Sequence, residues 1–332
     1  MLQNTYKIWE EKEYTYAGAF GFVPNIHTYL HEDEKKRPCM LVVPGGGYCV
    51  VSPTEGEIVA KRFYEAGYQA VVLTYTTDLI RVAPLKMQPL NDISRAVRYI
   101  RGNAEELKVD AEHIYAAGFS AGAHLTGSLA VHWQNVEDMN PTYKGISNKL
   151  QGVILSYPVI TAGKDAHRDS FLVLCGENAT EEELQYFSLE KHVSDHTPPV
   201  FMWQTVTDEV VPVENSMIMA AALRQAGVPF EYHLFPRGAH GLSLSNDDWE
   251  KGRFGELYTL EQTTKVIDAI KNDLIPLPEE VKKQLLDSFA GLASTEENDP
   301  TVLTSITGVA VKEVSVWPEL AITWLKELNN DI

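Results

Sequence analysis

The segment Ile114-Tyr-Ala-Ala-Gly-Phe-Ser-Ala-Gly-Ala-His-Leu125 carries the most specific structural signal in this chain. Its first four residues are apolar or aromatic, which predicts a short buried strand, and a predicted helix begins after Ser120. Between them, Gly118-Phe-Ser-Ala-Gly122 matches G-x-S-x-G, a pattern in which a serine on a sharp strand-to-helix turn is exposed at the end of a sheet. Because Gly118 and Gly122 lack side chains, such a turn can approach adjacent strands without a clash. Ser120 is therefore the predicted nucleophile.

The same alternation of strand and helix extends in both directions along the chain. From about residue 38 to about 240, short β-branched runs alternate with amphipathic stretches, as in βαβ units of a mostly parallel sheet. The expected strands are residues 40–43, 70–73, 114–117, 153–156, 200–203 and 231–235, all buried on both faces. The expected helices lie near residues 54–66, 91–104, 121–132 and 213–226, with an antiparallel lead-in before residue 30. We expect one α/β domain over residues 1–332, with helices on both faces of the sheet.

Two segments depart from this alternation. Residues 160–197 have no clear period and are expected to form a cap over one end of the sheet. In the C-terminal quarter, apolar residues at helical spacing predict two amphipathic helices separated by Pro276 and Pro278, then a polar break at residues 294–300. Their apolar positions are Val266, Ile270, Leu274, Val281, Leu285, Phe289 and Leu292. A last helix is expected to present Trp317, Leu320, Trp324, Leu325 and Leu328 on one face.

A serine nucleophile requires a histidine base and a carboxylate that orients it. In sheets of this kind both groups follow the serine, on loops after later strands. Asp208 comes directly after the strand expected near residue 200, and His240 follows the strand at residues 231–235. Both stand at the carboxyl ends of their strands, where catalytic groups of open α/β sheets gather. Asp208 and His240 are therefore the predicted acid and base.

Other residues could fill these roles. The alternative carboxylates are Glu209, which adjoins Asp208, and Asp165, Asp169 and Asp195 in the irregular segment. His124 lies on the same predicted helix as Ser120, and we interpret it as a packed polar residue. His192 and His196 precede a strand rather than follow one, which disfavours them as the base.

An acyl-transfer site also needs hydrogen-bond donors for the developing oxyanion. The backbone N–H of Ala121 is one candidate, and the loop Pro44-Gly-Gly-Gly-Tyr48 supplies Gly46 and Gly47 as the others. No Gly-Lys-Ser/Thr or G-x-G-x-x-G spacing accompanies these glycines, which disfavours a phosphate loop. The sequence has no H-E-x-x-H motif and no cysteine pair, so a metal hydrolase has no support.

Composition narrows the classes of partner. The 332 residues are 44% hydrophobic and 22% charged, which is typical of a globular chain with a large core. Acidic residues outnumber basic ones by 46 to 28, and the net charge of −18 disfavours nucleic acids and anionic membrane surfaces as partners. Cys39, Cys49 and Cys175 fit no disulfide framework, and the start of the chain has no apolar signal region. We expect a cytoplasmic protein.

These segments together make the chain resemble the α/β-hydrolase superfamily, in particular bacterial acetyl-xylan-esterase-like and lipase-like carboxylesterases. The resemblance covers most of residues 35–245. It rests on Pro44-Gly-Gly-Gly-Tyr48 with Ser52 and Glu55, Gly118 to Leu125, Thr207-Asp208 with residues 211–216, and Gly238-Ala-His-Gly-Leu242. Such esterases often carry histidine where Pro44 stands and a second glycine where Ala123 stands, but neither difference removes a donor. The resemblance implies the same triad and oxyanion loop.

The resemblance also concerns the end of the chain. Residues 317–325 resemble the closing helix that follows the histidine loop in similar proteins, so residues 248–314 are expected to be a helical insertion. We hypothesise that its helices cover the active-site mouth or build a subunit contact in a homo-oligomer. The plainer interpretation is that they enlarge the core.

The sequence thus predicts a single α/β-hydrolase domain that acts as a serine carboxylesterase on short acyl groups, without a cofactor. The resemblance implies acetylated oligosaccharides as substrates, and Tyr48, Trp203 and Trp249 could stack on a sugar ring, although Trp203 is more consistent with the core. A prolyl-oligopeptidase-type peptidase is an alternative, but the N-terminal 35 residues are too short for a β-propeller. A non-catalytic binding protein on the same fold is the other alternative.

Overall fold

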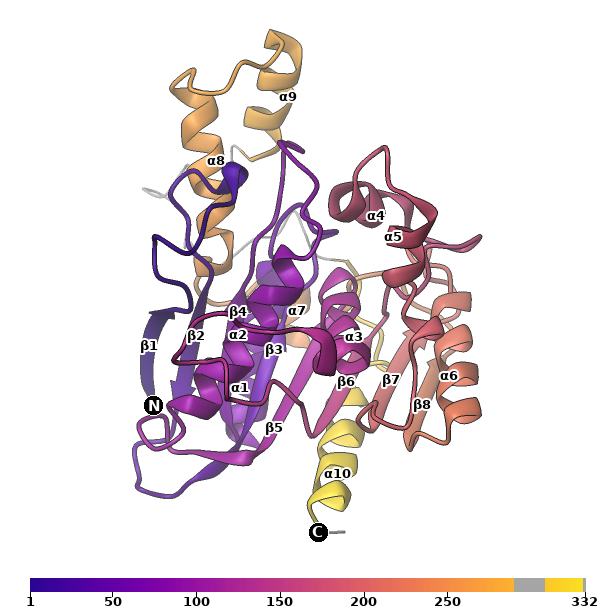
Figure 1. Cartoon of the computed structure of the whole chain (residues 1–332). Coiled ribbons are helices and arrows are strands. Elements are labelled where there is room, and N and C mark those ends of the chain that lie inside the picture. Colours follow the sequence, from indigo (N-terminus) through magenta and orange to yellow (C-terminus); the bar gives the residue numbers. More distant parts are fainter. Residues whose placement is uncertain (290–307, 331–332) are drawn as a thin grey trace.

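A computed structural model describes residues 1–289 and 308–330 of the chain (Figure 1). The described residues form an eight-stranded sheet with the order β1-β2-β4-β3-β5-β6-β7-β8. The strands are β1 (Leu2–Lys7), β2 (Asn25–Leu30), β3 (Arg37–Val43), β4 (Gln69–Thr74), β5 (Val109–Phe119), β6 (Gly152–Ser156), β7 (Val200–Thr205) and β8 (Phe230–Phe235). The pairs β1–β2 and β2–β4 are antiparallel, and all other pairs are parallel. The expected mostly parallel sheet with an antiparallel lead-in is confirmed.

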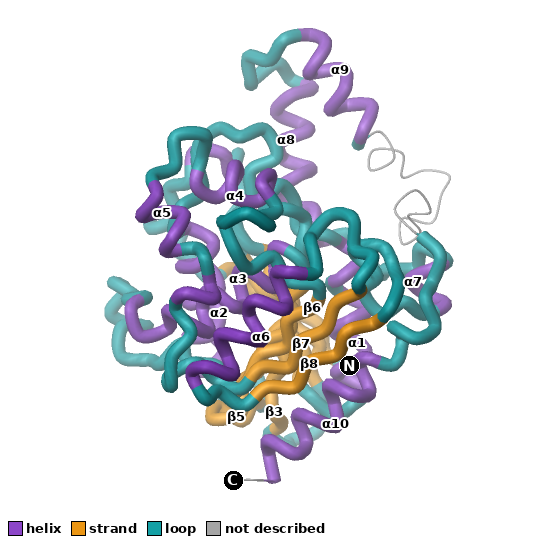
Figure 2. The backbone as a smooth tube through the Cα atoms, turned by 90° about the vertical axis from the view of Figure 1, so that its right-hand side faces the viewer, coloured by secondary structure: helices purple, strands orange, loops and turns teal. Residues whose placement is uncertain are grey.

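Helices cover both faces of this sheet (Figure 2). On one face, α2 (Gln88–Gly102), α3 (Ala121–His132) and α6 (Glu214–Ala226) bury apolar residues against the strands. On the other face lie α1 (Glu57–Glu65) and α10 (Trp317–Asn330), whose Phe63 and Trp317 are fully buried. The central strands are buried on both sides, as expected for a parallel sheet. The expectation of full burial is wrong for β8, which is an edge strand and only partly buried.

The segment at residues 160–197 forms short helices rather than strands. Helices α4 (Arg168–Cys175) and α5 (Glu181–Tyr186) lie together beyond one end of the sheet in Figure 1, followed by a 3-10 turn at Leu189–Lys191. Two backbone bonds hold α4 in place, because the N–H groups of Leu85 and Lys86 donate to the carbonyls of Val173 and Leu174. These contacts attach α4 to the loop at Leu85 and Lys86, and the cap over the end of the sheet stays a prediction.

The C-terminal quarter contains α7 (Asp247–Glu250), α8 (Glu261–Lys271) and α9 (Glu279–Ser288). Figure 1 shows α8 and α9 as a hairpin that projects from the body of the protein. Val266, Ile267 and Ile270 of α8 form a small apolar cluster of their own, against which Phe20, Leu79, Ile80 and residues of α9 pack. Leu274 does not continue the helical face, because α8 ends at Lys271 and Asp273 adopts a positive φ of 54°. Leu292 and residues 294–300 lie outside the described residues.

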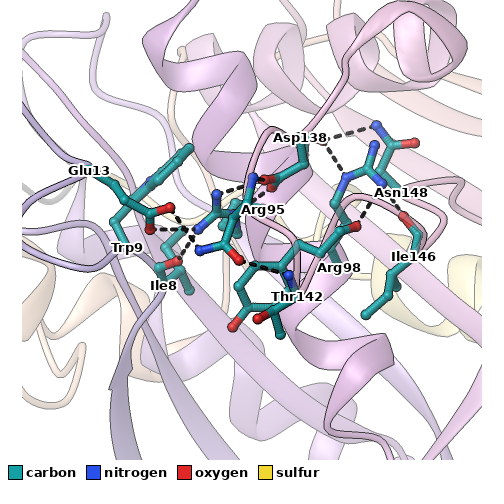
Figure 3. A network of polar contacts seen from close by, with 12 residues as sticks. Ile8, Trp9, Glu13, Arg95, Arg98, Asp138, Thr142, Ile146 and Asn148 are labelled. Carbon is teal, nitrogen blue, oxygen red and sulfur yellow. Dashed lines mark hydrogen bonds and ion pairs between the residues drawn. The ribbon is translucent and has the colours of Figure 1, made fainter.

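A buried arginine ties the N-terminal lead-in to the rest of the fold (Figure 3). Arg95 of α2 is only 2% exposed and pairs with Asp138, to which its Nη2 donates at 2.7 Å. Its Nη1 donates to the Ile8 carbonyl at 3.2 Å, and its guanidinium lies 4.0 Å above the Trp9 ring. Burying a charge costs free energy unless the charge is paired and hydrogen-bonded. These contacts therefore stabilise the buried guanidinium and hold the N-terminal lead-in against α2. Within the described ranges, no helix has the length and apolar character needed to cross a membrane.

Candidate active site

Ser120 occupies the sharp turn between β5 and α3. Its backbone has φ 51° and ψ −117°, a conformation that non-glycine residues rarely adopt and that projects the side chain from the sheet edge. The turn is also tightly packed. A Cβ atom at Gly122 would lie 2.1 Å from the Val43 carbonyl oxygen, and one at Gly118 would lie 2.4 Å from that of Gly122. Glycine at both positions is therefore a steric requirement of this turn.

The structure brings Ser120, His240 and Asp208 together from three loops that are distant in sequence. The distance between Ser120 Oγ and His240 Nε2 is 2.7 Å, and the distance between His240 Nδ1 and Asp208 Oδ2 is also 2.7 Å. Because the carboxylate oxygen accepts a hydrogen bond from Nδ1, Nε2 is left as the acceptor for the serine hydroxyl. This tautomer is the one that a general base acting on Ser120 requires.

The acid and base loops are fixed to each other by further hydrogen bonds. Asp208 Oδ1 accepts from the N–H groups of Val210 and Val211, both at 2.9 Å, so the buried carboxylate is well satisfied. The hydroxyl of Thr205 donates to the Gly238 carbonyl at 2.8 Å, and the Gly238 N–H donates to Thr207 Oγ1 at 2.9 Å. The loop that carries His240 is thus held against the end of β7.

The predicted oxyanion donors lie beside the nucleophile. Gly46 and Gly47 line the same cavity as Ser120, and both have positive φ, 118° and 63°. The Gly46 carbonyl closes this turn by accepting from the N–H groups of Cys49 and Val50. Among residues 1–289 and 308–330, the N–H groups of Gly46, Gly47 and Ala121 donate to no protein acceptor. These donors are available to a substrate carbonyl.

Polar and apolar side chains share the walls of the cavity, whose volume is about 440 Å³. Besides Ser120, His240, Gly46 and Gly47, its lining includes the polar residues Ser52, Thr54, Glu55 and His167 and the apolar residues Val210, Leu242, Trp249 and Val309. Burial, followed by the nearby His240, lowers the pKa of His167. Burial likewise raises the pKa of Glu55, against hydrogen bonds from Tyr157 and Gly45 that lower it.

The aromatic candidates for sugar stacking are placed differently from one another. Tyr48 is not in the cavity lining: its side chain is 1% exposed and its hydroxyl lies 2.7 Å from His124 Nδ1. Its positive φ of 64°, at the end of the glycine turn, is part of the reason, because the turn directs this side chain into the core. Trp203 is a core residue, whereas Trp249 does line the cavity.

The alternative acids and bases do not meet the nucleophile. Within the described part of the chain, His240 makes no hydrogen bond or ion pair with any carboxylate other than Asp208. Thus Glu209, Asp165, Asp169 and Asp195 do not occupy the acid position. His124 is fully buried, as the interpretation as a packed residue requires, and His192 instead lies 2.9 Å from the carbonyl of Gln185.

Sequence reasoning missed several cavity residues. His167 lies in the segment without a period, so no pattern indicates that it lines the same cavity as His240. Val309 and Trp249 line the cavity from within the expected insertion, and the sequence indicates a role only for Trp249, as a stacking residue. Glu55 belonged to a motif that carried the resemblance but had no assigned role. In the described part of the chain, no cluster of three or more His, Cys, Asp or Glu side chains could hold a metal ion.

The chain is similar in sequence to a known family and to characterised proteins. Residues 26–223 match the BD-FAE family. The endo-1,4-beta-xylanase B of Butyrivibrio fibrisolvens is 54% identical over 263 residues, 79% of this chain and 41% of that protein. The acetylxylan esterase of Xylanibacter ruminicola is 26% identical over 281 residues, 83% of this chain and 55% of that protein. This chain therefore spans about half the length of the curated relatives it matches.

Solved structures resemble the chain over most of their own length. The acetyl ester-xyloside bifunctional hydrolase from Caldicellulosiruptor lactoaceticus is 32% identical, with a TM-score of 0.68, and the match covers 82% of this chain and 97% of that one. The carboxylesterase Cest-2923 from Lactobacillus plantarum WCFS1 is 23% identical, with a TM-score of 0.64, and the match covers 99% of this chain and 98% of that one. The second similarity concerns the fold alone.

Proposed function

The chain belongs to the BD-FAE family, and on this premise we propose that it is a serine carboxylesterase that hydrolyses esters of short, acetyl-sized acyl groups. The α/β-hydrolase fold expected from the sequence is confirmed by the solved structures that share it. The observation that carries the proposal is the pair of 2.7 Å contacts linking Ser120, His240 and Asp208. These contacts lie beside the N–H groups of Gly46 and Gly47, which donate to no acceptor among the described residues, and Ser120, His240 and both glycines line one cavity.

In this mechanism, His240 Nε2 removes the hydroxyl proton as Ser120 Oγ forms a bond to the ester carbonyl carbon. The carbonyl electron pair moves onto oxygen, and backbone N–H groups of the glycine loop and of Ala121 stabilise the resulting oxyanion. Asp208 stabilises the imidazolium. The oxyanion then collapses, the bond to the alcohol oxygen breaks, and the alcohol leaves with the proton from His240. Water repeats the cycle on the acyl-enzyme, which releases the acid and restores the serine hydroxyl.

We further propose that the alcohol is an acetylated oligosaccharide of the xylan type. The support is the names of the relatives, an acetylxylan esterase and an acetyl ester-xyloside hydrolase, together with a cavity that offers both polar and apolar walls. Ser52, Thr54 and His167 could hydrogen-bond sugar hydroxyls, while Trp249, which is only 3% exposed, forms part of the apolar wall. The proposed chemistry needs no cofactor.

The test compares wild type with Ser120→Ala on p-nitrophenyl acetate, butyrate and octanoate, and on acetylated xylo-oligosaccharides with release of acetate as the readout. Ser128→Ala is the matched control, because it also removes a serine hydroxyl and Ser128 lies within α3, the helix that follows Ser120. The Ser128 hydroxyl donates to the His124 carbonyl and does not line the cavity. We expect serine-dependent hydrolysis that decreases as the acyl chain lengthens. Cleavage of an aminoacyl-proline anilide without cleavage of esters would instead identify a peptidase, and no turnover of either would favour a binding protein.

A further inference from the structure

Glu55 is a buried carboxyl group in the wall of the active-site cavity that the proposed mechanism does not use. It ends the 3-10 turn Pro53–Glu55 and is 3% exposed. Its Oε2 accepts from the Gly45 N–H at 2.7 Å, and its Oε1 accepts from the Tyr157 hydroxyl at 2.6 Å. Among the described residues no Lys, Arg or His forms an ion pair with it. Because burying a carboxyl group without a paired cation costs free energy, these two hydrogen bonds are needed to offset that cost.

The first of these bonds fixes the oxyanion loop. Gly45 directly precedes the predicted donors, and the loop lies so close to the nucleophile that a Cβ atom at Gly45 would be 2.6 Å from the Phe119 carbonyl oxygen and 2.9 Å from Ser120 Cβ. A small shift of this loop therefore changes the distance between the donors and the carbon that Ser120 attacks. The Glu55 carboxyl holds the N–H at the start of the loop.

The second bond leads to the base. Tyr157 follows β6, and its hydroxyl also accepts from the Ser243 N–H at 3.1 Å, on the loop that carries His240. The Tyr157 ring meets the His240 ring edge-on, with 4.9 Å between centroids. Ser243 is itself held by α10, because Trp317 Nε1 donates to its carbonyl at 2.7 Å. The side chains of Glu55 and Tyr157 thus connect Gly45 of the glycine loop to Ser243 of the histidine loop.

We propose that Glu55 and Tyr157 are positioning residues that set the distance between the oxyanion donors and the Ser120–His240 pair; in its application to ester turnover the inference rests on the proposed function. Neither residue exchanges a proton with the substrate. Glu55 acts through the Gly45 N–H, and Tyr157 acts through Ser243 and through its edge-on contact with the His240 ring.

Substitution by glutamine distinguishes positioning from charge. In Glu55→Gln, the amide oxygen can accept from the Gly45 N–H while the amide NH₂ donates to the Tyr157 oxygen, so the connection persists without the carboxylate. Glu55→Ala removes the connection altogether, and Tyr157→Phe removes only its second half. Asp92→Asn is the matched control: Asp92 is also a fully buried carboxyl that accepts from Thr76, Gln88 and Trp9, but it does not line the cavity.

The experiment measures two rates for each folded variant: kcat and KM for p-nitrophenyl acetate per titrated active site, and the rate of Ser120 phosphonylation by a fluorophosphonate. Loss of one oxyanion donor typically costs about 10²–10³ in kcat. Because Glu55→Ala displaces donors rather than removing one, we expect both rates to fall by about 10–100-fold with KM changed less than about threefold. Both rates of Glu55→Gln should stay within about fivefold of the wild-type rates. The rates of Tyr157→Phe should lie between those of Glu55→Ala and Glu55→Gln.

The rates of the variants support or overturn the positioning role of Glu55. Asp92→Asn should lower the unfolding temperature and leave both rates per active site unchanged. Wild-type rates in Glu55→Ala would overturn the positioning role, and a Glu55→Gln enzyme as slow as the alanine variant would assign Glu55 an electrostatic role instead. Phosphonylation without ester turnover in wild type would refute the proposed function while still testing the positioning role, because the oxyanion donors assist both reactions. A wild type that does neither would overturn both.

Discussion

Acidification should destabilise this protein partly through one buried imidazole, that of His124. The residue lies on α3, one turn after Ser120, and is fully buried. Its Nε2 lies 2.9 Å from the Phe187 carbonyl oxygen, which can only accept, so Nε2 carries the proton. Its Nδ1 then accepts from the Tyr48 hydroxyl at 2.7 Å. A second proton, on Nδ1, would force the Tyr48 hydroxyl to accept instead of donate, and it would place a charge in a fully buried site.

The size of the effect follows from the pKa of this group. Burial lowers the pKa of His124 from 6.5 to about 4, against the hydrogen bond to Phe187, which raises it, and with a smaller lowering by His132. Because the unfolded chain binds the proton more tightly than the folded one, stability is complete above the unfolded pKa and is lost as the pH falls towards the folded pKa. At about 1.4 kcal/mol per pKa unit, the loss is about 2 kcal/mol at about pH 5 and about 3 kcal/mol below the folded pKa.

The assay is urea unfolding followed by tryptophan fluorescence, at about pH 7.5 and about pH 5, for wild type and His124→Gln. Glutamine offers a donor to Phe187 but does not titrate, so the variant should lose about 2 kcal/mol less than wild type between these two pH values. His132, whose pKa burial also lowers to about 4, titrates in both proteins and cancels in the difference. His196→Gln, at an exposed site, is the control. Equal losses in wild type and His124→Gln would refute the reasoning.

Three substitutions test the packing around the site by urea unfolding. Gly122→Ala should cost about 3 kcal/mol or more, because the new Cβ would lie 2.1 Å from the Val43 carbonyl oxygen; a loss below about 1 kcal/mol would contradict the steric argument. Arg95→Met should cost about 3–5 kcal/mol by leaving Asp138 buried without its partner, and the double variant with Asp138→Leu should recover most of this loss. Trp317→Ala should cost about 3–5 kcal/mol through the cavity it leaves, with a lower kcat per active site because the histidine loop loses its support.

The proposed nucleophile, acid and base could be located in the fold from the sequence because each lies within a few residues of a strand end. Ser120 follows β5 directly, Asp208 follows β7, and His240 follows β8. Parallel strands bring their carboxyl ends to one edge of the sheet, so a residue just past a strand is located as soon as the strand is recognised. The glycine loop after β3 follows the same rule. The direction of a side chain within such a loop is less predictable, and Tyr48 points into the core because its backbone adopts a positive φ.

The remaining cavity residues depend on contacts between distant segments, for which periodicity carries no signal. Val309 reaches the cavity because the N–H of Val311 donates to Ser245 Oγ at 2.7 Å, five residues after His240, and the Ala310 N–H donates to Glu250. Residues 308–311 are thus fastened to the histidine loop, while α8 and α9 of the same segment pack against a separate apolar cluster. Among the described residues of the expected insertion, Trp249 of α7 and the returning residues Gly308 and Val309 line the cavity, whereas α8 and α9 do not. Changes at Trp249 or Val309 should therefore alter substrate preference, whereas changes in the α8–α9 hairpin should not.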